Sequence, residues 1–302
     1  MVRLWVKDYG EETAKEIADR CQGHRPLIVR CNTILCDPDQ LEEELVQILG
    51  KEHVRRSSVS DWIFYLDGAE NLGSWEPMKK GHMIVQDESS ALAALAAGAK
   101  PGMKVLDMCA APGGKSACMA ACMENQGVIR SCDIHEHKLE LIRENASRLG
   151  IHIMEPCLRD GTVLVEEEIE QNDVVLLDAP CSGLGIMRSK PDIRWNRKPE
   201  DIQELAMLQR QLIENAVLYV KPGGRLIYST CTITKQENEE NAQWLLDQYP
   251  NFAMGNLEKD LPTIGLCDMI KDSRKEGWCT ILPMENGRDG FFIASFTKNV
   301  SE

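Results

Sequence analysis

Two cysteines occupy positions in this sequence from which they could carry out covalent chemistry. Cys181 lies in "LLDAPCSG" and Cys231 lies in "YSTCT", and each follows an apolar segment with the composition of a buried strand. Neighbouring strand ends can bring both thiols into one pocket, and a thiolate is a good nucleophile. A lone cysteine at a strand end is more often a small, inert core residue. The interpretation therefore depends on the residues around the pair.

Three aspartates at comparable positions favour a ligand with a positive rather than a negative tail. Asp133 ends "GVIRSCD", Asp160 follows "IHIMEPC" within "LRDGT", and Asp178 ends "DVVLLD". Asp133 is placed to accept hydrogen bonds from ribose hydroxyls, and Asp160 could meet an adenine amino group. Any single aspartate could instead be a turn or capping residue. Together the three would repel a triphosphate but suit the sulfonium and amino groups of S-adenosylmethionine.

The segment "VLDMCAAPGGKSACMA" resembles a phosphate-binding loop but does not match its pattern. Gly114, Lys115 and Ser116 fit the second half of G-x-x-x-x-G-K-[ST], whereas Cys109 stands where the first glycine should be. Asp178, at the end of an apolar segment, imitates the magnesium-binding acid of ATPases. A P-loop-like NTPase is thus an alternative. With acids around it, the loop is better interpreted as a turn that lets backbone approach the methionine end of the methyl donor.

Two thiols beside a methyl-donor site point to methylation of a pyrimidine. Carbon 5 of cytosine is a poor nucleophile until a thiolate adds to carbon 6, after which carbon 5 can attack the methyl group. The addition requires a neutralised ring nitrogen 3, and Asp178 could donate there if its surroundings keep it protonated. The residues alone do not decide whether Cys181 or Cys231 is the nucleophile.

Alternating strands and helices must position these residues. From about residue 81 onward, the sequence predicts strands over 103–109, 127–133, 151–157, 173–180, 224–231 and 289–296, and helices over 114–123, 135–149, 201–220 and 235–248. This order predicts an α/β fold with a doubly wound, Rossmann-like parallel sheet. Ligands bind such sheets at the carboxyl ends of the strands, which is where the candidate residues fall.

The first 80 residues predict a small α+β domain ahead of this sheet, so that the chain divides into residues 1–80 and 81–302. A helix is expected over 9–21, and another begins after Asp37 and ends at Gly50. The segments "PLIVRCNT" and "DWIFYL" are typical of strands. A turn-rich segment over 67–82 links the two domains.

Composition limits the possible settings of the chain. The net charge of −14 argues against nucleic-acid binding by overall field. The 12 cysteines include no CxxC pair and no zinc-finger spacing, so we expect reduced thiols and no metal. No stretch of about 18 apolar residues occurs, and the start lacks the apolar core of a signal peptide. A cytoplasmic protein without a membrane span is therefore expected.

Several long motifs resemble the Sun/Fmu family of RNA cytosine-5 methyltransferases, which includes the RsmB and Nop/Sun proteins. The matching stretches are "VQDESS", "LDMCAAPGGK", "LLDAPCSGLGIMRSKPDIRW", "YSTCTITKQENEENAQWLL" and "RDGFFIASF". The resemblance implies a class I methyltransferase domain preceded by a small RNA-binding-like domain. The chain starts where the catalytic half of RsmB-type proteins starts, so their helical amino-terminal domain is expected to be missing.

The resemblance also implies roles for individual residues. Cys231 would be the nucleophile, and Cys181 would assist release of the methylated base. The S-adenosylmethionine site would be formed by Cys109, Ala110, Ala111, Pro112, Gly113, Gly114, Lys115, Asp133, Asp160 and Asp178. Lys115 could bind the carboxylate of the donor, contact RNA phosphate or pair with Asp178.

A basic segment after Cys181 is the candidate RNA contact. "IMRSKPDIRWNRK" holds five basic residues, one acid and a tryptophan. A charged run is often only a solvated loop, but this one directly follows a candidate catalytic residue and could hold phosphates near a flipped base. The expected RNA-binding residues are Arg188, Lys190, Arg194, Trp195, Arg197 and Lys198. The expected partner is ribosomal RNA, with the chain as a monomer; a noncatalytic RNA-binding module is a further alternative.

Overall fold

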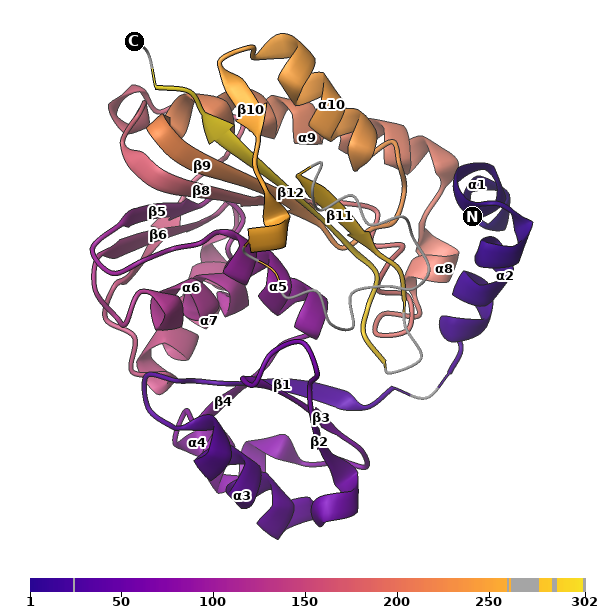
Figure 1. Ribbon diagram of the computed structural model, residues 1–302, viewed down its shortest axis with the longest axis vertical. Coiled ribbons are helices and arrows are strands. Elements are labelled where there is room, and N and C mark those ends of the chain that lie inside the picture. The colour runs from indigo at the N-terminus through magenta and orange to yellow at the C-terminus, as the bar shows by residue number, and fades with distance from the viewer. Residues whose placement is uncertain (24, 260, 262–276, 284–286, 301–302) are drawn as a thin grey trace.

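A large, mostly parallel sheet forms the centre of the molecule (Figure 1). The computed structural model describes residues 1–23, 25–259, 261, 277–283 and 287–300. Within them, the strands of this sheet lie in the order β10-β12-β9-β8-β5-β6-β7, and β11 pairs with β12. Their bounds are β5 Lys104–Asp107, β6 Val128–Asp133, β7 Met154–Leu158, β8 Asn172–Asp178, β9 Val220–Thr230, β10 Phe252–Met254, β11 Trp278–Ile281 and β12 Phe291–Lys298.

Five neighbouring strands, β7-β6-β5-β8-β9, run parallel, and β12 is antiparallel to β9. Strand order reverses at β5, which lies between β6 and β8. In doubly wound sheets the ligand crevice opens at such a reversal, outside the carboxyl ends of the strands. The sequence-based prediction of a doubly wound α/β fold is confirmed.

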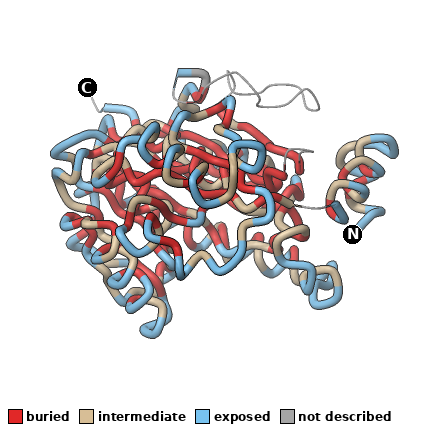
Figure 2. The backbone as a smooth tube through the Cα atoms, turned by 90° about the horizontal axis from the view of Figure 1, so that it is seen from below, coloured by how far each residue is buried: buried red, intermediate tan, exposed pale blue. Residues whose placement is uncertain are grey.

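Helices cover both faces of the large sheet (Figure 1). One buried cluster joins α5, α6 and α7 to one face, and a second joins α9 and α10 to the other. Strand β8 serves both clusters, because Val174 and Leu176 point to one face and Val175 and Leu177 to the other. The helices are α5 Glu88–Ala96, α6 Gly114–Cys122, α7 Glu136–Arg148, α8 Ile193–Asn196, α9 Pro199–Tyr219 and α10 Glu239–Gln248. The most buried backbone lies in this layered region (Figure 2).

A smaller antiparallel sheet, β2-β3-β1-β4, lies beside the large one. One face packs on α3 and the opposite face reaches α5 through Ile63, Tyr65 and Ala91. Asp37 caps α3 by accepting a hydrogen bond from the Asp39 N–H, as the sequence predicts. The elements are β1 Leu27–Cys31, α3 Pro38–Leu49, β2 Val54–Arg56, β3 Ile63–Leu66, α4 Glu76–Lys79 and β4 Met83–Val85. Short 3₁₀ turns lie at Lys51–His53, Leu72–Ser74, Glu166–Glu168 and Leu257–Lys259.

The first two helices, α1 (Val2–Tyr9) and α2 (Glu11–Arg20), pack away from the small sheet. Their apolar side chains join Leu184, Met187 and Ile233, which belong to loops of the large sheet. The Tyr9 hydroxyl donates to the Ile233 carbonyl over 2.5 Å. The small sheet, in turn, takes its last strand, β4, from beyond residue 80. A domain division at residue 80 stays a prediction. Elements from before residue 80 pack on loops of the large sheet, and one strand from after it joins the small sheet.

Two predicted elements have different bounds in the structure. The helix expected over 9–21 is two helices, because Gly10 adopts φ +85° and interrupts the chain between them. The helix expected over 235–248 begins only at Glu239. Before it, Glu237 accepts a hydrogen bond from the Thr234 hydroxyl, and Asn238 donates one to the Thr232 carbonyl. These bonds stabilise a loop in place of the first turn of the helix.

Among the described residues, no helix combines the length and hydropathy that a membrane crossing requires.

Candidate active site

A cavity of about 340 Å³ opens at the carboxyl ends of β5, β8 and β9. The register of β8 and β9 pairs Asp178 with Ser229, so Cys181 and Cys231 follow at nearly the same level beyond the sheet. Of the residues predicted to form the site, Cys109, Ala110, Ala111, Pro112, Gly114, Lys115, Asp178 and Cys231 line this cavity.

The loop between β5 and α6 forms one wall of the cavity. It leaves the sheet at Asp107 and enters α6 after Gly113, whose φ of +99° is one that other residues rarely adopt. The Ser116 hydroxyl, in the first turn of α6, donates to Asp107 Oδ2 over 2.7 Å. This bond ties the end of the strand to the start of the helix and fixes the loop between them.

The two candidate catalytic cysteines lie in contact, with their Sγ atoms 3.3 Å apart. Cys231 lines the cavity, whereas Cys181 lies behind it, outside the lining residues. The hydrogen bond to Cys231, together with burial, raises the pKa of the Cys181 thiol well above its ordinary value. Either sulfur can donate the hydrogen bond between them, and Cys231 is the one that faces the open space.

A network of buried polar groups fixes the loop that carries Cys181. Glu237 accepts hydrogen bonds from both the N–H and the hydroxyl of Ser182, at 2.8 and 2.6 Å. Gln209 donates to the Pro180 carbonyl at 2.9 Å and to Glu237 at 3.1 Å. Each residue that flanks the thiol is thereby held from α9 or from the segment before α10. The sequence indicates no role for Glu237 or Gln209, because neither lies in a recognisable chemical pattern.

Asp178 is engaged at both carboxyl oxygens. Lys115 Nζ donates to Oδ2 over 2.6 Å, and the Ser229 hydroxyl donates to Oδ1 over 2.9 Å. Burial opposes the charge on Lys115, but the attraction of Asp178 outweighs it, so the pKa of Lys115 lies above its ordinary value. Of the three contacts considered for Lys115, the structure contains the pair with Asp178. The arrangement fits a carboxylate that accepts two hydrogen bonds, rather than a carboxyl that donates one.

The two other predicted acids lie outside the lining of the cavity. Asp133 is buried at the end of β6, where its Oδ1 accepts from the His135 N–H at 3.0 Å and lies 3.6 Å from Lys138 Nζ. Asp160 accepts hydrogen bonds from the N–H and hydroxyl of Thr162, at 2.9 and 2.7 Å. These bonds lower the pKa of Asp160 and give it the geometry of a turn residue.

Two lining residues without a predicted role carry unsatisfied polar atoms. Asp107 Oδ1 and Gln86 Nε2 are buried and have no hydrogen-bond partner in the described part of the chain. Burial raises the pKa of Asp107 to about 7. Asp107 was recognisable in the sequence as an acid at a strand end, but Gln86 was not, since it reaches the cavity from the segment between β4 and α5.

Comparison with known proteins identifies the family of this chain. A family model described as 16S rRNA methyltransferase RsmB/F matches residues 94–297. The chain belongs to this family. It is also 37% identical over 303 residues to the probable ribosomal RNA small subunit methyltransferase B of Bacillus subtilis (strain 168), covering 99% of this chain and 65% of that protein. The chain spans about half to two thirds of the length of the curated relatives it matches.

Solved structures share the architecture of this RsmB/F-family chain. A methyltransferase homolog protein from Pyrococcus horikoshii is 31% identical with a TM-score of 0.79, covering 98% of this chain and 93% of that one. NSun6 from Pyrococcus horikoshii, solved with SFG, has a TM-score of 0.84 at 22% identity, covering 100% and 98% of the two chains. The likeness to NSun6 concerns the fold. The predicted resemblance and the Rossmann-like methyltransferase fold are confirmed.

Three arginines of the predicted RNA-binding segment make contacts within the RsmB/F-family chain. Arg188 Nε donates to the carbonyl of Arg20, the last residue of α2, over 2.6 Å. Arg194 donates to the carbonyl of Cys21. Arg197 donates to the carbonyls of Ser182 and Cys181, at 3.0 and 3.3 Å. These side chains hold the loop against α2 and around the thiol. A direct role in RNA binding remains a prediction for them.

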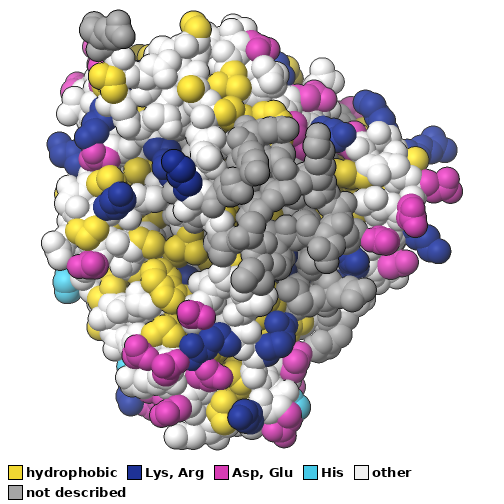
Figure 3. Space-filling view, viewed as in Figure 1, with side chains coloured by type: hydrophobic (Ala, Val, Ile, Leu, Met, Phe, Trp, Pro, Cys, Tyr) yellow, Lys and Arg dark blue, Asp and Glu magenta, His cyan; other side chains and the backbone are white. Residues whose placement is uncertain are grey.

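The three other predicted RNA-binding residues are open to solvent. Lys190 and Lys198 are exposed, and Trp195 is 86% exposed. Lys190 also lines the cavity. On the face shown in Figure 3, basic and acidic side chains are interspersed. Lys190, at the cavity rim, is therefore a cation that could meet a phosphate backbone.

One group of potential metal ligands lies away from the cavity. Atoms of Cys36, Glu44 and His82 lie within 4.8 Å of one another. His82 Nδ1 lies 2.9 Å from Glu44 Oε2, so a hydrogen bond accounts for their approach. No metal-binding spacing in the sequence marks this group, because its members come from separate elements of the small sheet.

Proposed function

We propose that this chain transfers a methyl group from S-adenosylmethionine to carbon 5 of a cytosine in ribosomal RNA, with Cys231 as covalent nucleophile. The observation that carries the proposal is the paired thiols: Cys231 faces the cavity, and Cys181 lies 3.3 Å behind it. Membership of the RsmB/F family supports an RNA substrate of the 16S rRNA class.

The cavity fits the amino-acid end of the methyl donor. An ammonium group needs an acceptor, and the unsatisfied Asp107 Oδ1 offers one; a carboxylate needs a donor, and Gln86 Nε2 offers one. A sulfonium near Asp178 and Asp107 would lie among acids, as its charge requires. When bound, the donor supplies an electrophilic methyl group. The lining residues of the β5–α6 loop would hold it beside Cys231.

Addition of Cys231 to carbon 6 needs a thiolate, whose proton goes to solvent before the attack, and a proton for the pyrimidine ring. The sulfur forms the new bond, and the displaced electron pair moves toward nitrogen 3. We assign the proton to the Lys115–Asp178 pair, which lines the same cavity as Cys231. A proton passes from Lys115 Nζ to Asp178 and from Asp178 to nitrogen 3, which leaves a neutral Lys115 beside the Asp178 carboxylate. The pair therefore does not require a carboxyl that is protonated at rest.

Release of the product reverses the addition. After methyl transfer, water removes the proton from carbon 5; the freed electron pair restores the ring double bond and expels the Cys231 sulfur as a thiolate, and the nitrogen 3 proton returns to the Lys115–Asp178 pair. Cys181 contacts that sulfur, and its raised pKa leaves it protonated and able to donate a hydrogen bond to the departing thiolate. We therefore assign Cys181 to the release step, not to the attack.

The test compares two cysteine variants on 16S rRNA with a radiolabelled methyl donor. Cys231→Ala should abolish labelling of cytosine, because no adduct can form. Cys181→Ala should retain the attack and accumulate a covalent protein–RNA adduct that survives denaturing electrophoresis. Cys157→Ala, at another partly buried thiol, is the matched control and should behave as wild type. Methylation by Cys231→Ala, or an adduct formed by it, would overturn the assignment of the nucleophile.

Two alternative functions gain no support from the site. Phosphate binding by the β5–α6 loop would need the Lys115 charge, which Asp178 already neutralises. A noncatalytic RNA-binding module would need neither thiol of the contacting pair. Calorimetry should therefore detect binding of S-adenosylmethionine and none of ATP with magnesium; the opposite result would favour an NTPase.

A further inference from the structure

We propose that a second cavity, next to the catalytic one, holds the base of a nucleotide adjacent to the target cytosine. This second space, the flanking cavity, has a volume of about 480 Å³ and lies between the small sheet and the rim of the catalytic cavity. The inference rests on the proposed function, since it assumes that RNA enters the catalytic cavity.

The flanking cavity adjoins the catalytic cavity. Four residues line both spaces: Arg25, Val85, Asp87 and Ser189. A cytosine that reaches Cys231 remains bonded through its sugar and phosphates to its neighbours in the RNA. The next nucleotide must therefore occupy space close to the rim, and the flanking cavity is space of that kind with its own walls.

The walls have the chemistry of a base-binding site. Leu27, Ala69 and the half-exposed Val85 provide apolar surface on which a flat ring can pack. The volume lies within the roughly 300–1,000 Å³ of typical small-molecule pockets. A base that is unstacked from its RNA neighbours loses contact area, and packing against such a surface restores that contact.

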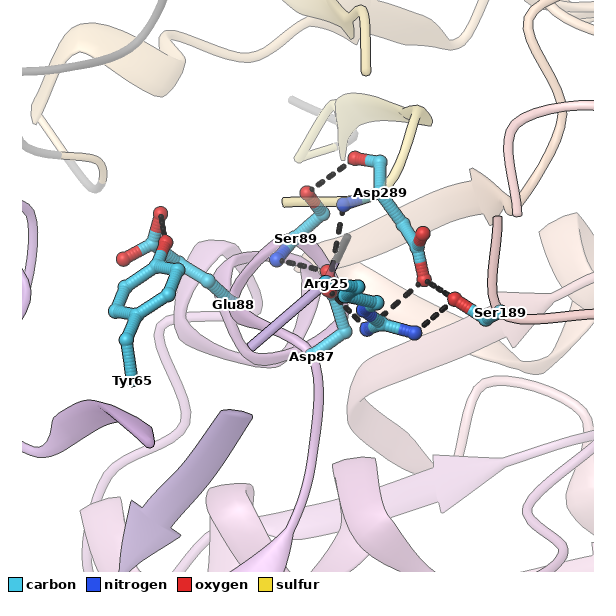
Figure 4. Close-up of polar contacts among 7 residues, drawn as sticks. All are labelled: Arg25, Tyr65, Asp87, Glu88, Ser89, Ser189 and Asp289. Carbon is cyan, nitrogen blue, oxygen red and sulfur yellow. Dashed lines mark hydrogen bonds and ion pairs between the residues drawn. The ribbon is translucent and has the colours of Figure 1, made fainter. Parts of the chain in front are cut away.

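Polar groups gather at the wall that the two cavities share (Figure 4). Arg25 lies between two acids, with its Nη2 atom 2.8 Å from Asp87 and 3.1 Å from Asp289. Ser189 bonds to both Arg25 and Asp289, the latter over 2.6 Å. These ion pairs and hydrogen bonds hold the guanidinium in place and fix a row of hydrogen-bond donors and acceptors along the shared wall.

The charges of this wall favour a base over a phosphate. Two acids face a single arginine, and a third acid, Glu70, lines the flanking cavity. Burial raises the pKa of Asp289 to about 7, and it raises the pKa of Asp87 as well. A phosphate would meet net negative or neutral surroundings here, whereas a neutral base meets no such repulsion. The exposed Lys190 at the catalytic rim is better placed for phosphate.

The test combines a change in the protein with a change in the RNA. The RNA is a 16S rRNA fragment with 5-fluorocytidine at the cytosine that wild type methylates. Fluorine at carbon 5 cannot leave as a proton, so the covalent adduct persists and its formation rate can be measured. Matched fragments carry an abasic ribose on the 5′ or the 3′ side of that cytosine. In the protein, Ala69→Trp fills the flanking cavity, and Gly73→Trp, in open space on the same loop, is the control.

We expect one of the two abasic sites to slow adduct formation by wild type about tenfold, as loss of one stacked base should. Ala69→Trp should slow the reaction of intact RNA to a similar extent and become insensitive to that abasic site. Gly73→Trp should keep the wild-type sensitivity. Glu70→Trp, at an exposed lining position, serves as a second filling variant if Ala69→Trp lowers the melting temperature.

Two outcomes would overturn the inference and are distinguishable. If wild type forms the adduct at equal rates with all fragments, or if the effects of Ala69→Trp and the abasic site multiply, no flanking base occupies the cavity. If wild type forms no adduct with intact RNA, the proposed function itself fails and the inference falls with it.

Discussion

At the scale of single residues, the contacts of a side chain indicate a chemical role that its residue type alone does not decide. The sequence marks Cys181, Cys231 and Asp178 as candidates because all three follow strand ends. It does not reveal which sulfur faces the cavity, since that depends on the path of each loop after its strand. Nor does it reveal that Lys115 pairs with Asp178, because the two residues come from different elements.

Asp107 should make binding of the methyl donor depend on pH. Its pKa of about 7, raised by burial, leaves it mostly protonated at pH 5.5 and mostly ionised at pH 7.5. Only the carboxylate attracts the donor's ammonium, which stays mostly protonated over this range. Calorimetry should therefore show roughly tenfold tighter binding at pH 7.5 than at pH 5.5. Asp107→Asn should bind weakly at both values, and a retained pH dependence in that variant would contradict the assignment.

The same pKa gives Asp107 a cost in stability. A carboxyl whose folded-state pKa is raised binds more protons in the folded than in the unfolded chain between about pH 4 and pH 7. Its contribution to the free energy of unfolding therefore falls as the pH rises through that window. A buried, partly unsatisfied acid that weakens the fold is the kind of residue that a ligand site retains.

At the scale of elements, helix α9 and the segment before α10 act together as a support for the Cys181 loop. Glu237 is fully buried and receives hydrogen bonds from Ser182, Thr234 and Gln209. The sequence predicts a helix through this position. That prediction is wrong there, because the side chains of Glu237 and Asn238 form hydrogen bonds with the neighbouring loop. Local propensity could not anticipate that tertiary demand.

Glu237→Gln should impair the release step more than substrate binding. The amide cannot accept at both positions, so the hydrogen bonds to Ser182 weaken and the Cys181 thiol shifts relative to Cys231. We expect kcat to fall about tenfold, with little change in the KM values, and adduct to accumulate as in Cys181→Ala. Glu240→Gln, at an exposed position on α10, is the control. A purely structural role would lower the melting temperature without accumulation of adduct.

At the scale of the whole molecule, the sequence predicts the large sheet and its helices better than it predicts how the other elements pack against them. Alternating strands and helices define the parallel sheet, since each element carries its own periodic pattern. The position of α1 and α2 beside the Cys181 loop depends on contacts between residues about 170 to 230 positions apart, such as those made by Arg194 and Tyr9. No local pattern encodes such pairs, and the flanking cavity between the sheets is likewise a product of docking.

A buried ion pair between α5 and the segment before β12 also contacts the small sheet, and it should affect how the two sheets are held together. Glu88 and Arg288 are fully buried, with their charged atoms 2.8 Å apart, and Glu88 also accepts from Tyr65 of the small sheet at 2.8 Å (Figure 4). Glu88→Gln removes the carboxylate that contacts the buried Arg288 guanidinium in this pair. We expect Glu88→Gln to lower the free energy of unfolding by about 3–5 kcal/mol, measured by urea denaturation.

The double variant decides whether charge pairing is the cause. Glu88→Gln with Arg288→Met removes both charges, so it should be less destabilised than the sum of the two single variants by at least about 1 kcal/mol. Additive losses would mean that the residues act through separate contacts. Because Glu88 accepts the hydrogen bond from Tyr65 that links the small sheet to α5, Glu88→Gln should also respond less to an abasic neighbour of the target cytosine. Loosening the docking of the sheets would thereby weaken the flanking cavity while leaving the paired thiols and the β5–α6 loop intact.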